Sequence, residues 1–207
     1  MISPPGPTEV LEELGDKFVT AISVAVAMTQ SDQLVYRQQH PLFAAAQSVG
    51  GWAYWIHDQL WKNLVAHVED LPGVSIRDDQ PQPTREIFVG LRYRVRVKRH
   101  DVKGGVATYP TPHARRLFRQ RQETLDGIQE VVLCVGYTWD NLTNSIKEPI
   151  LSLPRDIRRA EWLQALLPAE ADGATGVYTL RSAPEPAGPV APMIDFPGDE
   201  QTEEKQA

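Results

Sequence analysis

Residues 87–97 alternate without a break between two sets of side chains, and this pattern constrains the fold more than any other feature of the chain. Successive side chains of a β-strand point to opposite faces, so a period of two predicts one half-buried strand. A polar opposite face favours an antiparallel sheet. The predicted core face is Ile87, Val89, Leu91, Tyr93, Val95 and Val97, and the other face is Phe88, Gly90, Arg92, Arg94 and Arg96.

The part of the chain before this strand favours helices. Apolar residues recur three and four positions apart from Glu9 to Met28, which predicts a helix, although β-branched residues also permit a strand over 18–26. A polar stretch, 29–40, follows. Further helical spacing covers 42–49 and 52–68, with a break predicted at Gly50-Gly51 and a stop at Leu71-Pro-Gly73.

The part after the strand favours more strands around one short helix. Asp101–Gly105 has the composition of a hairpin turn, and Thr111-Pro112 supplies an N-cap and a first-turn proline. The segment 129–137 is apolar on both faces, which predicts a covered central strand. The remaining predictions are a return strand at 106–109, a helix over 112–121, a strand at 146–153, either a strand or a helix at 157–167, and an edge strand at 177–180.

These elements predict an α+β fold, with N-terminal helices packed on an antiparallel sheet of about four to five strands. We expect a flexible N-terminus at 1–8 and a single domain at 9–181, with a helical part at 9–71 and a sheet part at 84–181. Residues 182–207 hold five prolines and six acidic residues against one lysine, which predicts a disordered acidic tail.

Composition narrows the possible classes of protein. Cys134 is the single cysteine, so this chain cannot form an internal disulfide or a thiolate metal cage by itself. No apolar run approaches the roughly 20 residues of a membrane span, and the first residues do not resemble a signal peptide. We therefore expect a cytoplasmic protein without a membrane partner.

Charge is distributed unevenly along the chain. The net charge is −6, yet residues 85–121 carry eleven basic side chains against Glu86 and Asp101. This segment is therefore +9 and the rest of the chain is −15. Crowded like charges repel one another, so a blocked pattern indicates either a partner or internal pairing.

The basic face of the predicted strand is the first candidate site. It allows three interpretations: a solvated face with acidic neighbours in the fold, a platform for nucleic-acid phosphates, or a dock for an acidic protein surface such as the chain's own tail. We expect it to be left without acidic neighbours, and nucleic acid is the preferred ligand. The candidate anion-binding residues are Arg92, Arg94, Arg96 and Lys98 of the strand and Arg115, Arg116 and Arg119 of the short helix.

Two apolar features are candidate partner-binding sites. Aromatic residues at helical spacing within 52–68 are typical of a core, but they also dominate protein interfaces. A small apolar island interrupts the acidic tail. The candidate residues are Trp55 and Trp61 of the helix and Met193, Ile194 and Phe196 of the tail.

Catalytic motifs are weakly represented, and we expect no cofactor and no bound metal. Cys134 lies in a buried strand, and His57 and His67 are ten residues apart on different helix faces, so they do not form a joint metal site. Asp101-Val-Lys103 has the acid-x-lysine form of metal-dependent nucleases. Asp is also common in turns for conformational reasons, so a nuclease remains only an alternative.

Three stretches, LRYRVRVKRH, ATYPTPHARRLFRQ and EVVLCVGYTWDNLTNSI, resemble small uncharacterised proteins of actinobacterial phages and prophages. Genes for such proteins lie near helix-turn-helix repressor and metallopeptidase-like genes. The resemblance covers about residues 86–166. It implies a regulatory, immunity or toxin–antitoxin context and no particular activity.

The expected function is that of a non-catalytic regulatory or accessory module that binds a macromolecule. Nucleic acid bound through the basic strand face is the preferred ligand, because the +9 segment stands inside an acidic chain. The alternatives are a protein-interaction or structural component, as in a phage particle or a toxin–antitoxin pair, and a metal-dependent nuclease.

Overall fold

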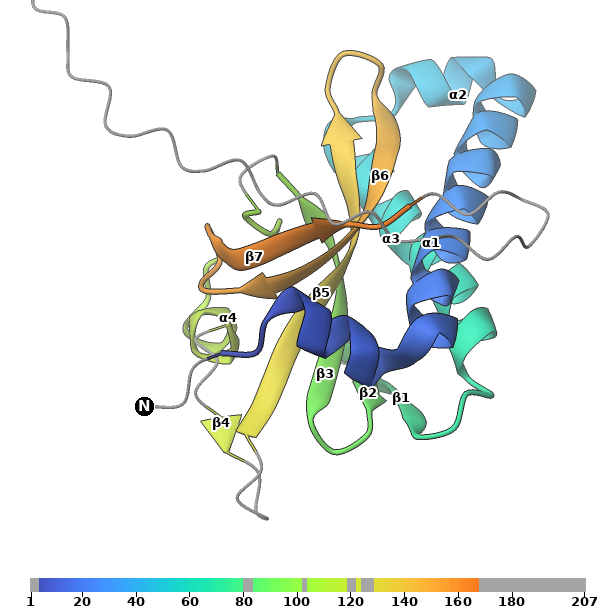
Figure 1. Cartoon of the computed structure of the whole chain (residues 1–207). Helices are drawn as coiled ribbons and strands as arrows, with labels where there is room; N and C mark the ends of the chain where they lie inside the picture. The colour runs from blue at the N-terminus through green and yellow to red at the C-terminus, as the bar shows by residue number, and fades with distance from the viewer. Residues whose placement is uncertain (1–3, 80–83, 102–103, 119–121, 124–128, 168–207) are drawn as a thin grey trace, which may run out of the picture.

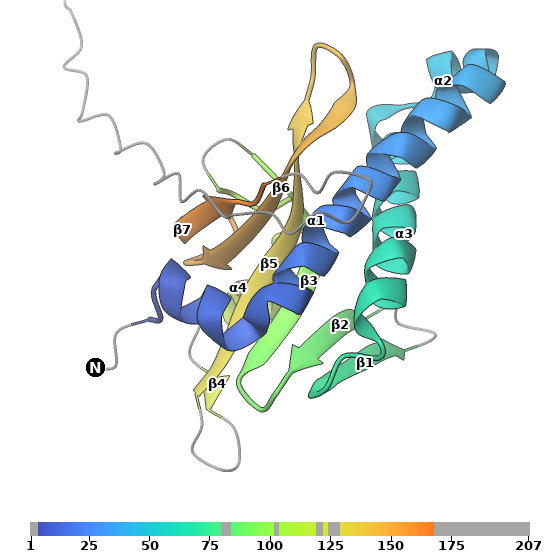
Figure 2. The same ribbon diagram turned by 45° about the vertical axis from the view of Figure 1, so that its right-hand side comes forward.

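The computed structural model describes residues 4–79, 84–101, 104–118, 122–123 and 129–167 (Figure 1). Its architecture is α+β, as predicted: N-terminal helices pack on one face of a mostly antiparallel sheet. Figure 2 shows the two long helices, α1 (Pro7–Gln39) and α3 (Val49–Val68), side by side over this face. The predicted edge strand at 177–180 and the acidic tail lie outside the described residues.

The first predicted helix is confirmed and extends well beyond its apolar pattern. α1 bends at Gly15, whose φ of 77° costs a glycine little. The polar residues after Met28 are also helical, and tertiary contacts stabilise this part of α1. For example, the side chain of buried Gln33 donates to the carbonyl oxygen of Asn144 at 3.2 Å. The alternative of a strand over 18–26 is therefore wrong.

The predicted helix break at Gly50-Gly51 is wrong, because the interruption lies a few residues earlier. The short helix α2 (Pro41–Ala46) ends before Ser48, and α3 runs through both glycines. The Ser48 Oγ accepts a hydrogen bond from the Gly51 amide at 3.0 Å, which satisfies a free amide of the first turn. The two glycines therefore lie in the first turn of a helix rather than at a hinge.

Residues 87–97 form most of a hairpin rather than the single strand predicted. β2 (Thr84–Val89) and β3 (Tyr93–His100) pair antiparallel across a tight turn. Gly90 in this turn has φ of 60°, and Leu91 is 74% exposed. The alternation continues across the turn because both strands direct the same set of side chains to the core.

Six strands lie in the order β1-β2-β3-β5-β6-β7, and a short β4 pairs with β5 outside this path. β7 shows that the ambiguous segment 157–167 contains a strand, and β1 is a strand that the sequence pattern did not predict. The remaining bounds are β1 Val74–Asp79, β4 Gln122–Glu123, β5 Gln129–Asp140, β6 Ser145–Pro154 and β7 Ala160–Ala165.

β3 and β5 run parallel, which departs from the purely antiparallel sheet predicted. The chain leaves β3, forms the helix α4 (Pro112–Leu117) and returns as β5, and such a crossover makes neighbouring strands parallel. The Thr111 Oγ1 caps α4 by accepting from the Ala114 amide, as predicted. The predicted return strand at 106–109 is reduced to one bridge between Val106 and His100.

The sheet has a hydrophobic core on each face. The larger core joins α1 and α3 to the side chains of Ile87, Tyr93, Val95 and Val97 and their neighbours. The smaller core lies under α4 and consists of Val106, Ala114, Leu117, Phe118, Val132 and Cys134. β5 contributes to both cores, which confirms that it is a covered central strand.

Helix α1 is long and apolar enough to cross a membrane by length and composition alone. The expectation that no apolar run approaches the length of a membrane span is therefore wrong for this helix. Half of the apolar stretch is buried against the sheet and α3, as in the core helix of a globular fold.

Candidate functional site

The predicted face of unpaired arginines on β3 is wrong, because the fold itself supplies carboxylates. The Arg96 Nε donates to the Glu86 Oε1 at 2.8 Å, and Glu86 is only 1% exposed. The Arg94 Nη2 donates to the Glu130 Oε2 at 2.9 Å, and its Nη1 lies 3.8 Å from the Glu86 Oε1. These side chains form a largely buried ion-pair network on the α4 face of the sheet, reached from β2, β3 and β5.

Arg92 does not share this face. It lies in the turn between β2 and β3, and its guanidinium reaches α1 on the other side of the sheet. There it donates to the Glu13 Oε1 at 2.6 Å and to the Glu9 Oε1 at 2.9 Å. The Tyr93 hydroxyl donates to the second oxygen of Glu13 at 2.7 Å. Arg92 therefore anchors the start of α1 to the hairpin.

The other predicted anion-binding residues differ in their surroundings. Lys98 is half-buried and has no acidic partner among the described residues. Arg115 is exposed on α4, also without an acidic partner in the described part of the chain. The side chains of Arg116 and Arg119 lie outside the described structure. The seven predicted residues thus do not form one continuous basic surface.

The two tryptophans predicted to bind a partner have different environments. Trp61 is buried, and its Nε1 donates to the Asp78 Oδ2 at 3.1 Å, so it belongs to the core. Trp55 is half-buried, and its ring lies 5.8 Å from that of Trp52 and 5.5 Å from that of Tyr36. The predicted residues Met193, Ile194 and Phe196 lie outside the described residues.

The aromatic cluster around Trp55 lies next to an exposed apolar surface that the sequence pattern did not predict. At the end of the molecule where α1, α2 and α3 meet (Figure 1), large apolar side chains face solvent. No residue of α2 is buried, although its sequence is PLFAAA. We call this surface the helical end, and its exposed members are Leu34, Val35, Leu42, Phe43, Val49 and Tyr54.

Four of the six members of the helical end, Leu42, Phe43, Val49 and Tyr54, lie in a stretch without charged residues. Residues 38–57 contain no Asp, Glu, Lys or Arg, in a chain of which 23% is charged. The nearest cation, Arg37, lies 5.1 Å above the Trp52 ring and donates to carbonyl oxygens of the β5–β6 turn, including that of Thr143 at 3.2 Å. The sequence alone shows that this stretch carries no charged residues. Its exposure to solvent could be seen only in the folded structure.

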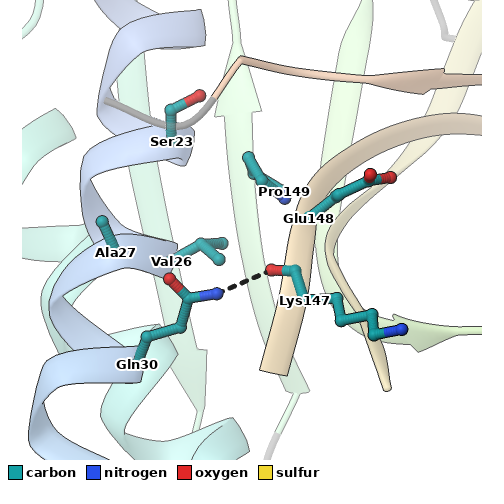
Figure 3. Close-up of a pocket in the computed structure, with 7 residues that line it drawn as sticks. All are labelled: Ser23, Val26, Ala27, Gln30, Lys147, Glu148 and Pro149. Carbon is teal, nitrogen blue, oxygen red and sulfur yellow. Dashed lines mark hydrogen bonds between the residues drawn. The ribbon is translucent and has the colours of Figure 1, made fainter. Parts of the chain in front are cut away.

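A groove of about 410 Å³ lies between α1 and β6 (Figure 3). Gln30 closes one side by donating to the carbonyl oxygen of Lys147 at 2.9 Å. The hydroxyl of Ser23 is buried and has no hydrogen-bond partner among the described residues. Lys147 is paired with Asp140 at 3.3 Å, and the exposed side chain of Glu148 also lines the groove.

A buried polar pair links β3 and β6. The His100 Nε2 lies 2.8 Å from the Ser152 Oγ, and both side chains are inaccessible to solvent. Burial lowers the pKa of His100 to about 4, so this ring is neutral near neutral pH. The pair therefore acts as an uncharged hydrogen bond within the α4 face of the sheet.

Asp101, one of the two residues of the nuclease-like pattern, has a structural role. The Asp101 Oδ1 accepts from the Gly105 amide at 2.9 Å, which closes the turn after β3, and Lys103 lies outside the described residues. Among the described residues, no three His, Cys, Asp or Glu side chains gather closely enough to hold a metal ion.

Comparisons with known proteins found no matching family model, no similar curated protein and no similar solved structure. The resemblance to phage and prophage proteins therefore stays a prediction.

Proposed function

We propose that this chain is a non-catalytic interaction component whose helical end associates with a second copy of itself. The carrying observation is that no residue of the apolar helix α2 is buried, with Leu42 83% and Phe43 71% exposed. Large exposed apolar patches on globular proteins mark interaction surfaces. Trp52, Trp55 and Tyr36 support the patch from beneath with edge-to-face and tilted ring contacts.

Charge favours a second copy as the partner. In a symmetric dimer each interface residue meets the same patch of the other subunit, so a charged face would bring like charges together. The whole chain carries −6, whereas residues 38–57 carry no Asp, Glu, Lys or Arg. Homodimer interfaces are also the most apolar and charge-depleted class of protein interfaces.

Replacement of Phe43 by glutamate tests this proposal. The wild-type chain is expected to be a dimer at micromolar concentration in sedimentation and light-scattering measurements. Phe43→Glu is expected to be a monomer with an unchanged melting temperature, because the residue it replaces is exposed in the single chain. Leu91→Glu is the matched control, since Leu91 is 74% exposed in the β2–β3 turn and should leave the dimer intact. A wild-type chain that remains a monomer, or a dimeric Phe43→Glu variant, would contradict the proposal.

Nucleic-acid binding is a second candidate function, favoured by exposed arginines around α4. Arg115, Arg158 and Arg159 are exposed and have no acidic partner within the described part of the chain. The turn that carries the last two adjoins α4, because the Val106 amide donates to the Ile157 carbonyl at 3.3 Å and both side chains pack in the α4 core. We propose this surface in place of the predicted face of β3, because Arg94 and Arg96 of that face are already paired with carboxylates.

The nucleic-acid proposal predicts salt-sensitive binding through these arginines. Labelled single- and double-stranded DNA and RNA should bind at low salt in fluorescence anisotropy, and affinity should fall as salt rises, because phosphate contacts release counterions. Arg115→Glu with Arg158→Glu should weaken this binding by at least about tenfold. Lys17→Glu is the control, being an exposed cation on α1. Equal binding by both variants, or none by the wild type, would exclude this function.

A further inference from the structure

A small pocket of about 110 Å³ lies between α3 and the strands β3 and β5. Its wall includes three groups that donate hydrogen bonds to anions: His57 of α3, and Lys98 and Arg99 of β3. Ala53 and Tyr137 contribute apolar surface to the same wall. A pocket of this size is well below the range of about 300–1,000 Å³ that is typical of larger organic ligands, so it suits a small ion.

His57 lines this pocket with one side of its ring among charged neighbours. The Arg85 Nη1 lies 3.4 Å from the His57 Nδ1. Asp58 lies on the same Nδ1 side, 3.9 Å away, and is itself bound by Arg85. The His57 Nε2 has no hydrogen-bond partner among the described residues, so this ring nitrogen is left for a ligand.

Lys98 and Arg99 differ from the arginines before them on β3. Arg94 and Arg96 have carboxylate partners, whereas neither Lys98 nor Arg99 has one within the described part of the chain. Burial lowers the pKa of Lys98, and burial followed by the charges of Lys98 and Arg85 lowers the pKa of His57. The fold therefore holds positive charge in a partly desolvated place without a counter-charge, at a cost in stability.

We propose that the pocket formed by His57, Lys98 and Arg99 binds a tetrahedral oxyanion, namely a phosphate group. A phosphate accepts several hydrogen bonds at once, and charge-assisted bonds from ammonium and guanidinium groups are the strongest available to it. The site is distinct from the helical end and does not depend on dimer formation. The phosphate group comes either as the free ion or as the end of a phosphomonoester.

Isothermal titration calorimetry with inorganic phosphate near neutral pH tests the site. The wild-type chain should bind one phosphate ion. Lys98→Met and Arg99→Gln should each lower the affinity by at least about tenfold. Arg115→Gln, which removes an equally unpaired charge outside the pocket, should bind like the wild type. No binding at millimolar phosphate, or equal losses in all three variants, would overturn the proposal.

Two further measurements keep the test independent of folding defects. Without phosphate, the melting temperature of Lys98→Met should equal or exceed that of the wild type, because the substitution removes an unpaired, partly buried charge. Added phosphate should raise the melting temperature of the wild type but not that of Lys98→Met. NMR titration should show that the pKa of His57 rises when phosphate is added, because a bound anion favours the protonated ring. The charges of Asp58, Arg85 and Lys98, which also act on His57, are the same with and without phosphate. An unchanged His57 titration at saturating phosphate would also overturn the proposal.

Adenosine monophosphate distinguishes the two sources of the phosphate group. If the monophosphate and inorganic phosphate bind with similar affinity in the same pocket, the free ion is the sufficient ligand. If the monophosphate binds more tightly and loses that binding in Lys98→Met, the site serves a phosphomonoester end. Both results support the oxyanion site, and binding of the monophosphate that is insensitive to Lys98→Met counts against it.

Discussion

Replacement of Glu86 by alanine is expected to lower the free energy of unfolding by about 3–5 kcal/mol. Glu86 is 1% exposed and is the shared acceptor of the network that holds Arg94 and Arg96. Without Glu86, the guanidinium groups of Arg94 and Arg96, which are 19% and 15% exposed, both lose a carboxylate partner. An uncompensated charge in such a place costs more than the intact pair contributes.

Urea denaturation of a short series of variants measures this effect. Glu86→Gln keeps the shape of the side chain and removes its charge, so it should account for most of the loss seen in Glu86→Ala. The double variant Glu86→Gln with Arg96→Met should recover part of the stability, because it removes a charge left unpaired. Glu9→Ala is the control: Glu9 is an exposed partner of Arg92, and such pairs contribute about 0–1 kcal/mol. A loss below about 1 kcal/mol in Glu86→Ala would contradict the network's role.

Replacement of Gly136 by alanine is expected to be the most damaging glycine substitution in the described chain. A Cβ at this position would lie 1.9 Å from the backbone oxygen of Lys98, which is closer than any real contact. Gly136 is directly opposite Lys98 in the parallel β3–β5 ladder, so the obstacle is backbone in the centre of the sheet. Overpacking of this kind costs about 3 kcal/mol or more, because neither strand can move without breaking its pairing.

Thermal and urea denaturation of Gly136→Ala check this expectation. Gly50→Ala is the matched control, because it makes the same substitution in a helix where only the Ser48 hydroxyl lies within reach, at 3.8 Å. This control should keep or slightly raise the stability, since alanine favours helix more than glycine does. A Gly136→Ala protein as stable as the wild type would show that β3 and β5 do not approach each other this closely.

The two stability predictions concern the same region, where the sequence interpretation of function was incomplete. The arginines of β3 were correctly placed on a strand, but Arg94 and Arg96 were expected to lack acidic neighbours. Glu130, the partner of Arg94, lies on the neighbouring strand β5. Glu86 lies only ten residues from Arg96, but a single-strand interpretation of 87–97 keeps the two from facing each other.

At the helical end, the composition could be read from the sequence but the exposure to solvent could not. Residues 38–57 are visibly free of charge in the sequence, and the spacing around Trp52 indicates a helix. A charge-free apolar segment is equally compatible with a core, so exposure could not be derived from composition. The exposure follows from the position of α2. This helix connects α1 to α3 beyond the edge of the sheet (Figure 2), and none of its residues is buried in the described structure.

The sequence by itself determined the α+β class, the helical character of the N-terminal part and the face that β3 turns to the core. These properties depend on periods of two and of three to four residues, which are local. The tertiary structure alone decided the hairpin in 87–97, the parallel pairing of β3 with β5 and the pairing of Arg94 and Arg96 with carboxylates. The physical reason is distance along the chain: Glu9 and Glu13 reach Arg92 across some eighty residues, and no local pattern specifies which charges the folded chain brings together.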